Sequence, residues 1–169
     1  MNVEQLATLE EDWLSKQRTI KGDREILYGQ AGVYAAWRDI FVRYVALTQE
    51  GDLEALKRAV YFVWAQYSIG RLITGIKDLD EGMVHEALGI ADELAKDNRL
   101  DAELQWMLPY YYVVNPGFLD RWEDLDTLKS VSREHPFLYR QRCLEVSFDH
   151  RGQMGDYWKA EQACLRRWP

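Results

Sequence analysis

The residues best suited to metal binding in this chain of 169 residues are its three histidines, His85, His135 and His150. His85 and Glu86 begin like the zinc motif His-Glu-x-x-His, but Gly89 occupies the position of the second histidine. The paired Glu-x-x-His motifs of helical di-iron sites are missing from the sequence. The three histidines could still meet in the fold, but their spacing does not favour it. We therefore predict no bound metal and no cofactor.

Three further stretches begin like known motifs and do not complete them. The segment 70-GRLITG-75 has two glycines, but no Gly-Lys-Ser/Thr follows, so it does not predict a phosphate-binding loop. The segment 78-DLDEG-82 opens like a calcium loop, but Gly82 falls where an oxygen ligand is needed. Ser68 lacks the glycine that precedes the serine of a nucleophile elbow by two residues. We therefore predict that the protein is not an enzyme.

The two cysteines and the apolar runs indicate where the protein works. Cys143 and Cys164 form no Cys-x-x-Cys pair, and neither belongs to a recognisable Cys/His arrangement. We expect reduced thiols in a cytoplasmic protein, with a single bridge between them left open. The N-terminal stretch carries acids where a secretory signal carries basic residues. The longest apolar run, 59-AVYFVWA-65, is far shorter than the roughly 20 residues that span a bilayer, so we expect no membrane contact.

Hydrophobic residues recur at helical spacing along nearly the whole chain, and no alternating strand pattern is present. We expect an all-α protein, an irregular helical bundle or a stack of antiparallel helical hairpins, with about six or seven helices in one domain over residues 1–169. The strongest helical patterns cover 3–19, 33–48, a segment from 53, 81–96, a segment from 101 to Pro109, and 156–168, and weaker patterns lie over 118–131 and from 136. Segments 20–30, 70–75 and 150–155 are expected to be connections.

One helix is expected at the centre of the bundle. Residues 59–65 are apolar on almost every face, and a helix that is apolar all round is buried all round. Gly51 and Asp52 suit the end of the preceding helix and the start of this one. Asp78 or Asp80 is expected to cap the next helix.

The stretch 103-ELQWMLPYYYVVNPG-117 combines a proline with three consecutive tyrosines. Pro109 cannot donate to the carbonyl of Gln105, so we expect the helix to kink or end there, at a cost of about 3 kcal/mol or more. The rings of Tyr110, Tyr111 and Tyr112 fan over about 200° of a helix, wider than a one-sided apolar stripe. At least one of the three is therefore expected to be exposed or to line a cleft.

Charge is unevenly distributed along the sequence. Thirteen acids and three basic residues lie between Asp78 and Asp126, whereas the stretch from Pro136 onward carries six basic residues and four acids. The net charge of −7 argues against nucleic acid as a partner, because a phosphate backbone would be repelled. The acids can simply form a solvated face, or they can steer a basic protein partner.

We expect a non-enzymatic cytosolic protein of a bacterial type that acts through protein–protein interaction with a basic partner. An inhibitor or immunity-type protein would have such a sequence, and a homodimer stays open as a further assembly. The alternative is a helical bundle that binds a small molecule in an aromatic-lined pocket near Pro109, with tyrosine hydroxyls, His85 and Arg71 as its polar groups. The interface residues that we predict, with aromatics as anchors and acids as rim, are Asp97, Asp101, Trp106, Tyr110, Tyr111, Tyr112, Asp120 and Asp124.

Overall fold

The computed structural model describes residues 1–167, and these residues form helices and connections with no strand. The all-α prediction is confirmed, but the count of six or seven helices is wrong for the described residues, which form eleven α-helices and one short 3-10 helix. Several of the additional helices span only four to seven residues. The helices are α1 (Val3–Thr19), α2 (Arg24–Gln30), α3 (Val33–Gln49), α4 (Leu53–Ser68), α5 (Arg71–Thr74), α6 (Glu81–Lys96), α7 (Leu104–Val114), α8 (Gly117–Asp120), α9 (Asp126–Ser132), α10 (Tyr139–Arg142), η1 (Cys143–Glu145) and α11 (Gly152–Arg167).

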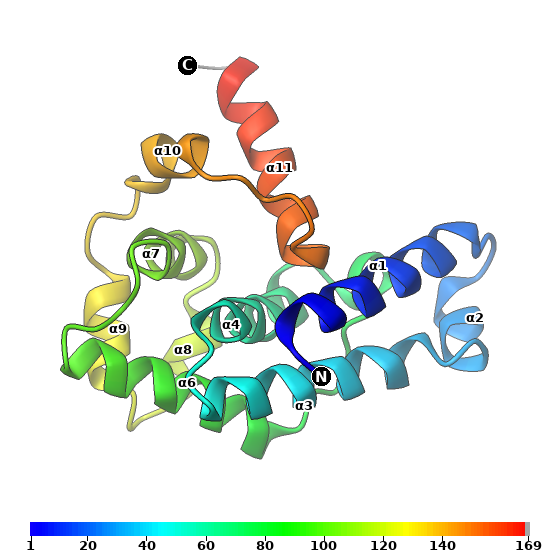
Figure 1. Ribbon diagram of the computed structural model, residues 1–169, viewed down its shortest axis with the longest axis horizontal. Helices are drawn as coiled ribbons and strands as arrows, with labels where there is room; N and C mark the ends of the chain where they lie inside the picture. The colour runs from blue at the N-terminus through cyan, green and yellow to red at the C-terminus, as the bar shows by residue number, and fades with distance from the viewer. Residues whose placement is uncertain (168–169) are drawn as a thin grey trace.

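Helix α4 lies at the centre of the arrangement, as its sequence predicts. Every residue from Ala55 to Ala65 is buried, and α4 packs against α3, α6, α7, α8 and α11. Figure 1 shows α4 with α1 and α3 on one side and α7 and α8 on the other. The buried stretch includes two charged residues, Lys57 and Arg58, so the centre of the protein is not purely apolar.

Side-chain caps fix where the long helices begin. The Asn2 side chain accepts a hydrogen bond from the backbone N–H of Gln5 at 2.9 Å, and the Gln5 side chain accepts one from the backbone N–H of Asn2. The two bonds together form a capping box. Asp52 caps α4 and Asp80 caps α6, each by accepting from a backbone N–H three residues later at 2.9 Å. The bounds of α6 agree with the sequence expectation, since an acidic cap and a regular apolar stripe define them.

The predicted connections contain more helix than expected. Segment 20–30 includes α2, whose N-terminus is capped by the Asp23 side chain, and segment 70–75 includes the single turn α5. The helix expected over 118–131 is split into α8 and α9. The buried carboxylate of Asp92 accepts from the backbone N–H of Leu128 at 2.7 Å, which fixes the first turn of α9 against α6. Helix α11 begins at Gly152, inside the predicted loop 150–155.

Helix α7 continues through Pro109 as one element, so of the two expectations, a kink or an end, the end is wrong. The helical hydrogen bonds of the backbone start at the carbonyl of Asp101, three residues before α7 begins, because the N–H of Gln105 donates to this carbonyl at 3.1 Å. Gln105 is exposed, so water can reach the carbonyl that Pro109 cannot bond. Leu104, Leu108 and the other buried side chains of α7 offset the single lost hydrogen bond.

The last helix closes the bundle. Helix α11 packs against α1 and α4, and Figure 1 shows it rising away from α4 beside α10. None of the helices in residues 1–167 is long and apolar enough to cross a bilayer.

Candidate functional site

The tyrosine run of α7 divides between the interior and the surface. Trp106, Tyr110 and Tyr111 are buried, with 3%, 6% and 0% of their surface exposed. Tyr112 is half-buried, and its hydroxyl donates to Asp120 Oδ1 at 2.9 Å. The expectation that at least one of the three tyrosines reaches the surface is therefore met by Tyr112. Trp106, Tyr110 and Tyr111 are covered by other residues of the same chain, so they cannot contact a partner protein as predicted.

Tyr111 lies in the middle of an aromatic cluster that α11 closes over α7. Its ring stacks on Trp64 of α4, with centroids 4.6 Å apart and planes inclined by 24°. The indole Nε1 of Trp158 in α11 donates to the Tyr111 hydroxyl at 3.0 Å, and the hydroxyls of Tyr110 and Tyr157 are hydrogen-bonded to each other. Burial raises the pKa of both Tyr110 and Tyr111. Their hydroxyls therefore stay protonated, and the rings act as core.

The four predicted acids differ in exposure. The side chains of Asp97, Asp120 and Asp124 are 63%, 43% and 64% exposed, so they can meet a partner. Asp101 is only 20% exposed, and its Oδ2 lies 3.0 Å from Nζ of the buried Lys57. Asp101 therefore belongs to an internal ion pair and not to the rim of a contact surface.

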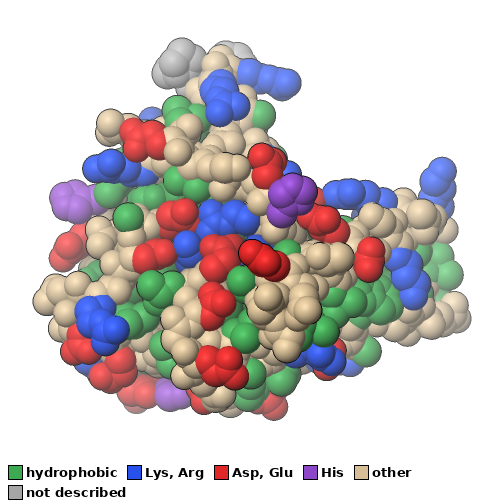
Figure 2. Space-filling view, in the orientation of Figure 1, with side chains coloured by type: hydrophobic (Ala, Val, Ile, Leu, Met, Phe, Trp, Pro, Cys, Tyr) green, Lys and Arg blue, Asp and Glu red, His purple; other side chains and the backbone are tan. Residues whose placement is uncertain are grey.

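The exposed acids of α6, α8 and the start of α9 lie on packed elements, since α6 and α8 both contact α9. Figure 2 shows acidic side chains over this part of the molecule, at the lower left. Basic side chains accompany most of them: Arg121 Nη2 lies 2.7 Å from Glu81, and Lys129 Nζ lies 2.9 Å from Asp126. Lys96, Arg99, Arg133 and His85 lie within 4.0 Å of Glu93, Asp97, Asp120 and Asp124. We define the acidic surface as Glu81, Glu93, Asp97, Asp120, Glu123, Asp124 and Asp126.

A buried group of charges lies where α1, α4, α7 and α11 meet, and the sequence reasoning missed it. Lys57 Nζ lies 3.1 Å from Glu54, 3.0 Å from Asp101 and 3.0 Å from Glu103. Arg151 donates to Glu54 Oε1 at 2.8 Å and to Glu103 Oε2 at 2.6 Å. The one available signal was a Lys-Arg pair inside an otherwise apolar helix. We call this group the ionic network: Glu10, Glu54, Lys57, Arg58, Asp101, Glu103 and Arg151.

Glu10 is the deepest member of the ionic network, with 1% of its surface exposed. The Tyr44 hydroxyl donates to Oε1, and Arg58 Nη1 donates to the Tyr44 hydroxyl at 3.0 Å. The backbone N–H of Gln153 donates to Oε2 at 3.0 Å, so the carboxylate satisfies a free donor at the N-terminus of α11. Burial raises the pKa of Glu10, although the Tyr44 hydrogen bond, the positive charge of Arg58 and the Gln153 N–H oppose this shift. The network ties α1, α3, α4 and α11 together, and its arrangement is that of a structural element.

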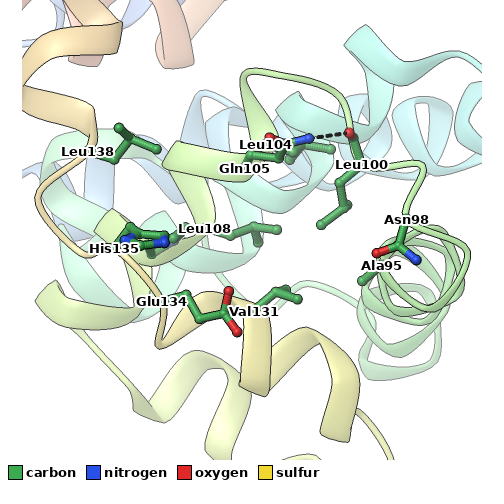
Figure 3. Close-up of a pocket in the computed structure, with 11 residues that line it drawn as sticks. Ala95, Asn98, Leu100, Leu104, Gln105, Leu108, Val131, Glu134, His135 and Leu138 are labelled. Carbon is green, nitrogen blue, oxygen red and sulfur yellow. Dashed lines mark hydrogen bonds between the residues drawn. The ribbon is translucent and has the colours of Figure 1, made fainter.

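A cavity of about 310 Å³ lies beside Pro109, between α6, α7 and α9. Its place agrees with the alternative prediction of a pocket near Pro109, but its lining is aliphatic where an aromatic lining was expected. Figure 3 shows Leu100, Leu108 and Val131 directed at a common space, with the Glu134 carboxylate beside Val131. Neither the tyrosines of α7 nor His85 and Arg71 contribute to the lining. The lining residues are Ala95, Asn98, Leu100, Leu104, Gln105, Leu108, Pro109, Val131, Glu134, His135 and Leu138.

The three histidines lie in different parts of the molecule, and Figure 2 shows them as separate patches. His85 Nε2 lies 2.7 Å from Asp124 Oδ2, and this hydrogen bond lowers the pKa of Asp124. His150 Nδ1 lies 3.4 Å from Glu11, and His135 lines the cavity. Within residues 1–167, no three side chains of His, Cys, Asp or Glu are grouped so that they could hold a metal ion.

The two cysteines are free thiols, with Cys143 buried in η1 and Cys164 exposed on α11. Burial raises the pKa of Cys143 to about 11, so its thiol is protonated at neutral pH. A protonated, buried thiol is a poor nucleophile.

Comparison with protein-family models, curated proteins and solved structures gave no match.

Proposed function

We propose that the protein acts by binding another protein with a basic surface, and that the acidic surface is its contact region. The observation that carries this proposal is the excess of exposed carboxylates between positions 81 and 133, where seven exposed acids stand against four exposed cations: Lys96, Arg99, Arg121 and Arg133. An acidic region speeds association with a basic partner by orders of magnitude at low salt and disfavours acidic competitors. An inhibitor or immunity-type protein that neutralises a basic enzyme or toxin is the kind of protein that we propose.

The ion pairs already present on the acidic surface do not close it to a partner. Glu93 pairs with Lys96 at 2.7 Å, and its side chain is 71% exposed. Exposed pairs of this kind contribute about 0–1 kcal/mol, so a cation of a partner can compete for the carboxylate. The Asp126 side chain is 87% exposed beside Lys129. Both carboxylates therefore stay accessible to a second molecule.

An apolar contact is available at the edge of the acidic surface, at the C-terminal end of α7. Val113 and Val114 have about half of their surface exposed, at 50% and 49%. Tyr112 precedes them, and its hydroxyl bonds Asp120 of the acidic surface. These three side chains replace the buried Trp106 and Tyr110 as the apolar part of the proposed contact. Apolar anchors bounded by charged groups are the usual composition of a protein interface.

The test is capture of binding proteins from a cell lysate, at low and at high ionic strength, by wild type and by a charge-reversed variant. Asp101 is left out of the reversal, because a lysine there would face the buried Lys57 and destabilise the fold. We expect wild type to retain a basic protein at low ionic strength and to lose it at high ionic strength, because salt screens exposed charges. The reversed positions are Glu93→Lys, Asp97→Lys, Glu123→Lys and Asp126→Lys.

A second variant with the same change in net charge provides the control. Four exposed acids outside the acidic surface are reversed, so that overall charge is matched and only the location differs. We expect the control to keep the captured protein and the first variant to lose it. Equal loss in both variants would reduce the effect to net charge, and equal retention would remove the acidic surface from function. The control positions are Glu4→Lys, Asp12→Lys, Glu50→Lys and Glu145→Lys.

A further inference from the structure

The cavity beside Pro109 combines a buried apolar floor with a partly exposed wall. Leu104 and Leu108 are fully buried at its base, whereas Leu100, Val131 and Leu138 are partly exposed around it. Its volume of about 310 Å³ corresponds to roughly ten water molecules. This volume is at the lower end of the range for small-molecule pockets, so a matching ligand is a small one.

The one charged side chain among the described lining residues, Glu134, is a hydrogen-bond acceptor. The Glu134 carboxylate is exposed, and the neighbouring Arg133 pairs with Asp120 instead of with Glu134. The Gln105 amide nitrogen uses one of its two N–H groups to donate to the Leu100 carbonyl at 3.0 Å, and Gln105 Oε1 can accept. The main-chain carbonyl of Gln105 lacks its helical donor, because Pro109 has no N–H. Asn98 and His135 complete the polar lining and can act in either role.

The lining therefore favours a ligand that donates hydrogen bonds and carries positive charge at one end. Its described residues include no Trp, Tyr or Phe, so the cavity does not offer the aromatic faces that bind quaternary ammonium groups. A protonated primary or secondary amine can instead donate to the carboxylate of Glu134. We propose that this cavity binds a small aliphatic amine, with its ammonium group on Glu134 and its hydrocarbon part against Leu104, Leu108 and Val131.

The experiment compares three probes of one shape and different charge: cyclohexylamine, cyclohexanol and cyclohexanecarboxylate. Titration calorimetry gives the affinities, and methyl NMR of the leucines gives the location. We expect the amine to bind about two- to fivefold more tightly than the alcohol, because one partly exposed ion pair separates the two probes. The carboxylate is expected to bind most weakly, since Glu134 repels it. Methylamine, which lacks the hydrocarbon ring, is expected not to bind.

Two variants separate the charge from the shape of the cavity. Glu134→Gln removes the charge of an exposed side chain and should bring the amine down to the affinity of the alcohol. Ala95→Leu fills the cavity and should weaken both probes, with folding checked by circular dichroism. Glu145→Gln, an exposed glutamate outside the lining, serves as the matched control and should bind as wild type does.

The outcomes that overturn the proposal are distinct from those of the protein-binding test. Equal affinity for cyclohexylamine and cyclohexanol in wild type would show a nonspecific apolar site. An unchanged preference for the amine in Glu134→Gln, or methyl shifts away from Leu104 and Leu108, would place the amine elsewhere. No binding of any probe would leave the cavity without the proposed role, and would not affect the acidic surface.

Discussion

The carboxylate of Glu10 occupies the space in which a side chain at position 152 would begin. A Cβ on Gly152 would lie 2.2 Å from Oε2 of Glu10, and the backbone there is left-handed, with φ of 57°. Tyr44 and the backbone N–H of Gln153 hold the carboxylate in place, so it has little room to retreat. The start of α11 and the buried acid of α1 therefore fit only when position 152 is glycine.

Gly152→Ala is expected to destabilise the protein by roughly 2–5 kcal/mol. The left-handed backbone accounts for about 1–2 kcal/mol and the close contact for about 1–3 kcal/mol. Gly32→Ala is the control, since Gly32 is also left-handed, with φ of 74°, but nothing lies within 4 Å of its Cβ position. Gly32→Ala should therefore be destabilised only by the cost of the left-handed backbone, about 1–2 kcal/mol. Chemical denaturation measures both, and equal losses would show that the contact with Glu10 is unimportant.

The carboxylates of Glu54 and Glu10 should give stability opposite dependences on pH. Burial raises the pKa of Glu54, but Arg151, Lys57 and Arg58 together lower it further, so the net shift is downward. Its contribution is present above the pKa of the unfolded chain and is lost as pH falls through the lower folded pKa. The raised pKa of Glu10 has the reverse sign, so stability declines as pH rises from the unfolded pKa through the raised folded pKa.

The measurement is the free energy of unfolding between acid and neutral pH for wild type and two variants. Glu54→Gln should flatten the loss of stability on acidification, because the titrating group is gone. Glu10→Gln should flatten the decline on the neutral side of that range. Curves for Glu54→Gln that run parallel to wild type would mean that Glu54 does not contribute to the acid sensitivity.

The two neighbouring tyrosines Tyr111 and Tyr112 should respond differently to loss of the hydroxyl. Tyr111→Phe removes the acceptor of the buried Trp158 Nε1–H and should cost about 1–3 kcal/mol. Tyr112→Phe removes hydrogen bonds at the surface and should change stability by about 0.5 kcal/mol or less. Thermal unfolding followed by tryptophan fluorescence measures both. A loss at Tyr112 as large as that at Tyr111 would contradict the division of the run into core and surface.

Helix bounds were predicted well wherever one segment carries its own signals. Asp80 and the apolar stripe after it are enough to define α6, and the apolar run 59–65 places α4 at the centre. Helix α9 was not predicted separately, because its first turn depends on a bond between Leu128 and Asp92, 36 residues apart. Such a long-range contact leaves no local pattern in the sequence.

The candidate site was harder to predict for the same reason. Tyr110 and Tyr111 were assigned to a contact surface, but Tyr157 and Trp158 of α11 cover them from the other end of the chain. Asp101 was assigned to the acidic rim, but it pairs with Lys57. The angular spread of the tyrosines correctly indicates one ring at the surface. Whether the other rings are covered by a partner protein or by α11 of the same chain depends on the fold.

The bond between Glu10 and Gln153 has a consequence for the order of events during protein synthesis. It joins positions 143 residues apart, and α11 is synthesised after the other helices in residues 1–167. Until then Glu10 lacks its main-chain donor, and the rings of Trp64 and Tyr111 lack their cover. The nascent chain therefore presents an uncovered aromatic surface until α11 has emerged and packed. Intermediates with exposed apolar surface are prone to aggregation, so the packing of α11 is the step that removes this risk from the aromatic cluster.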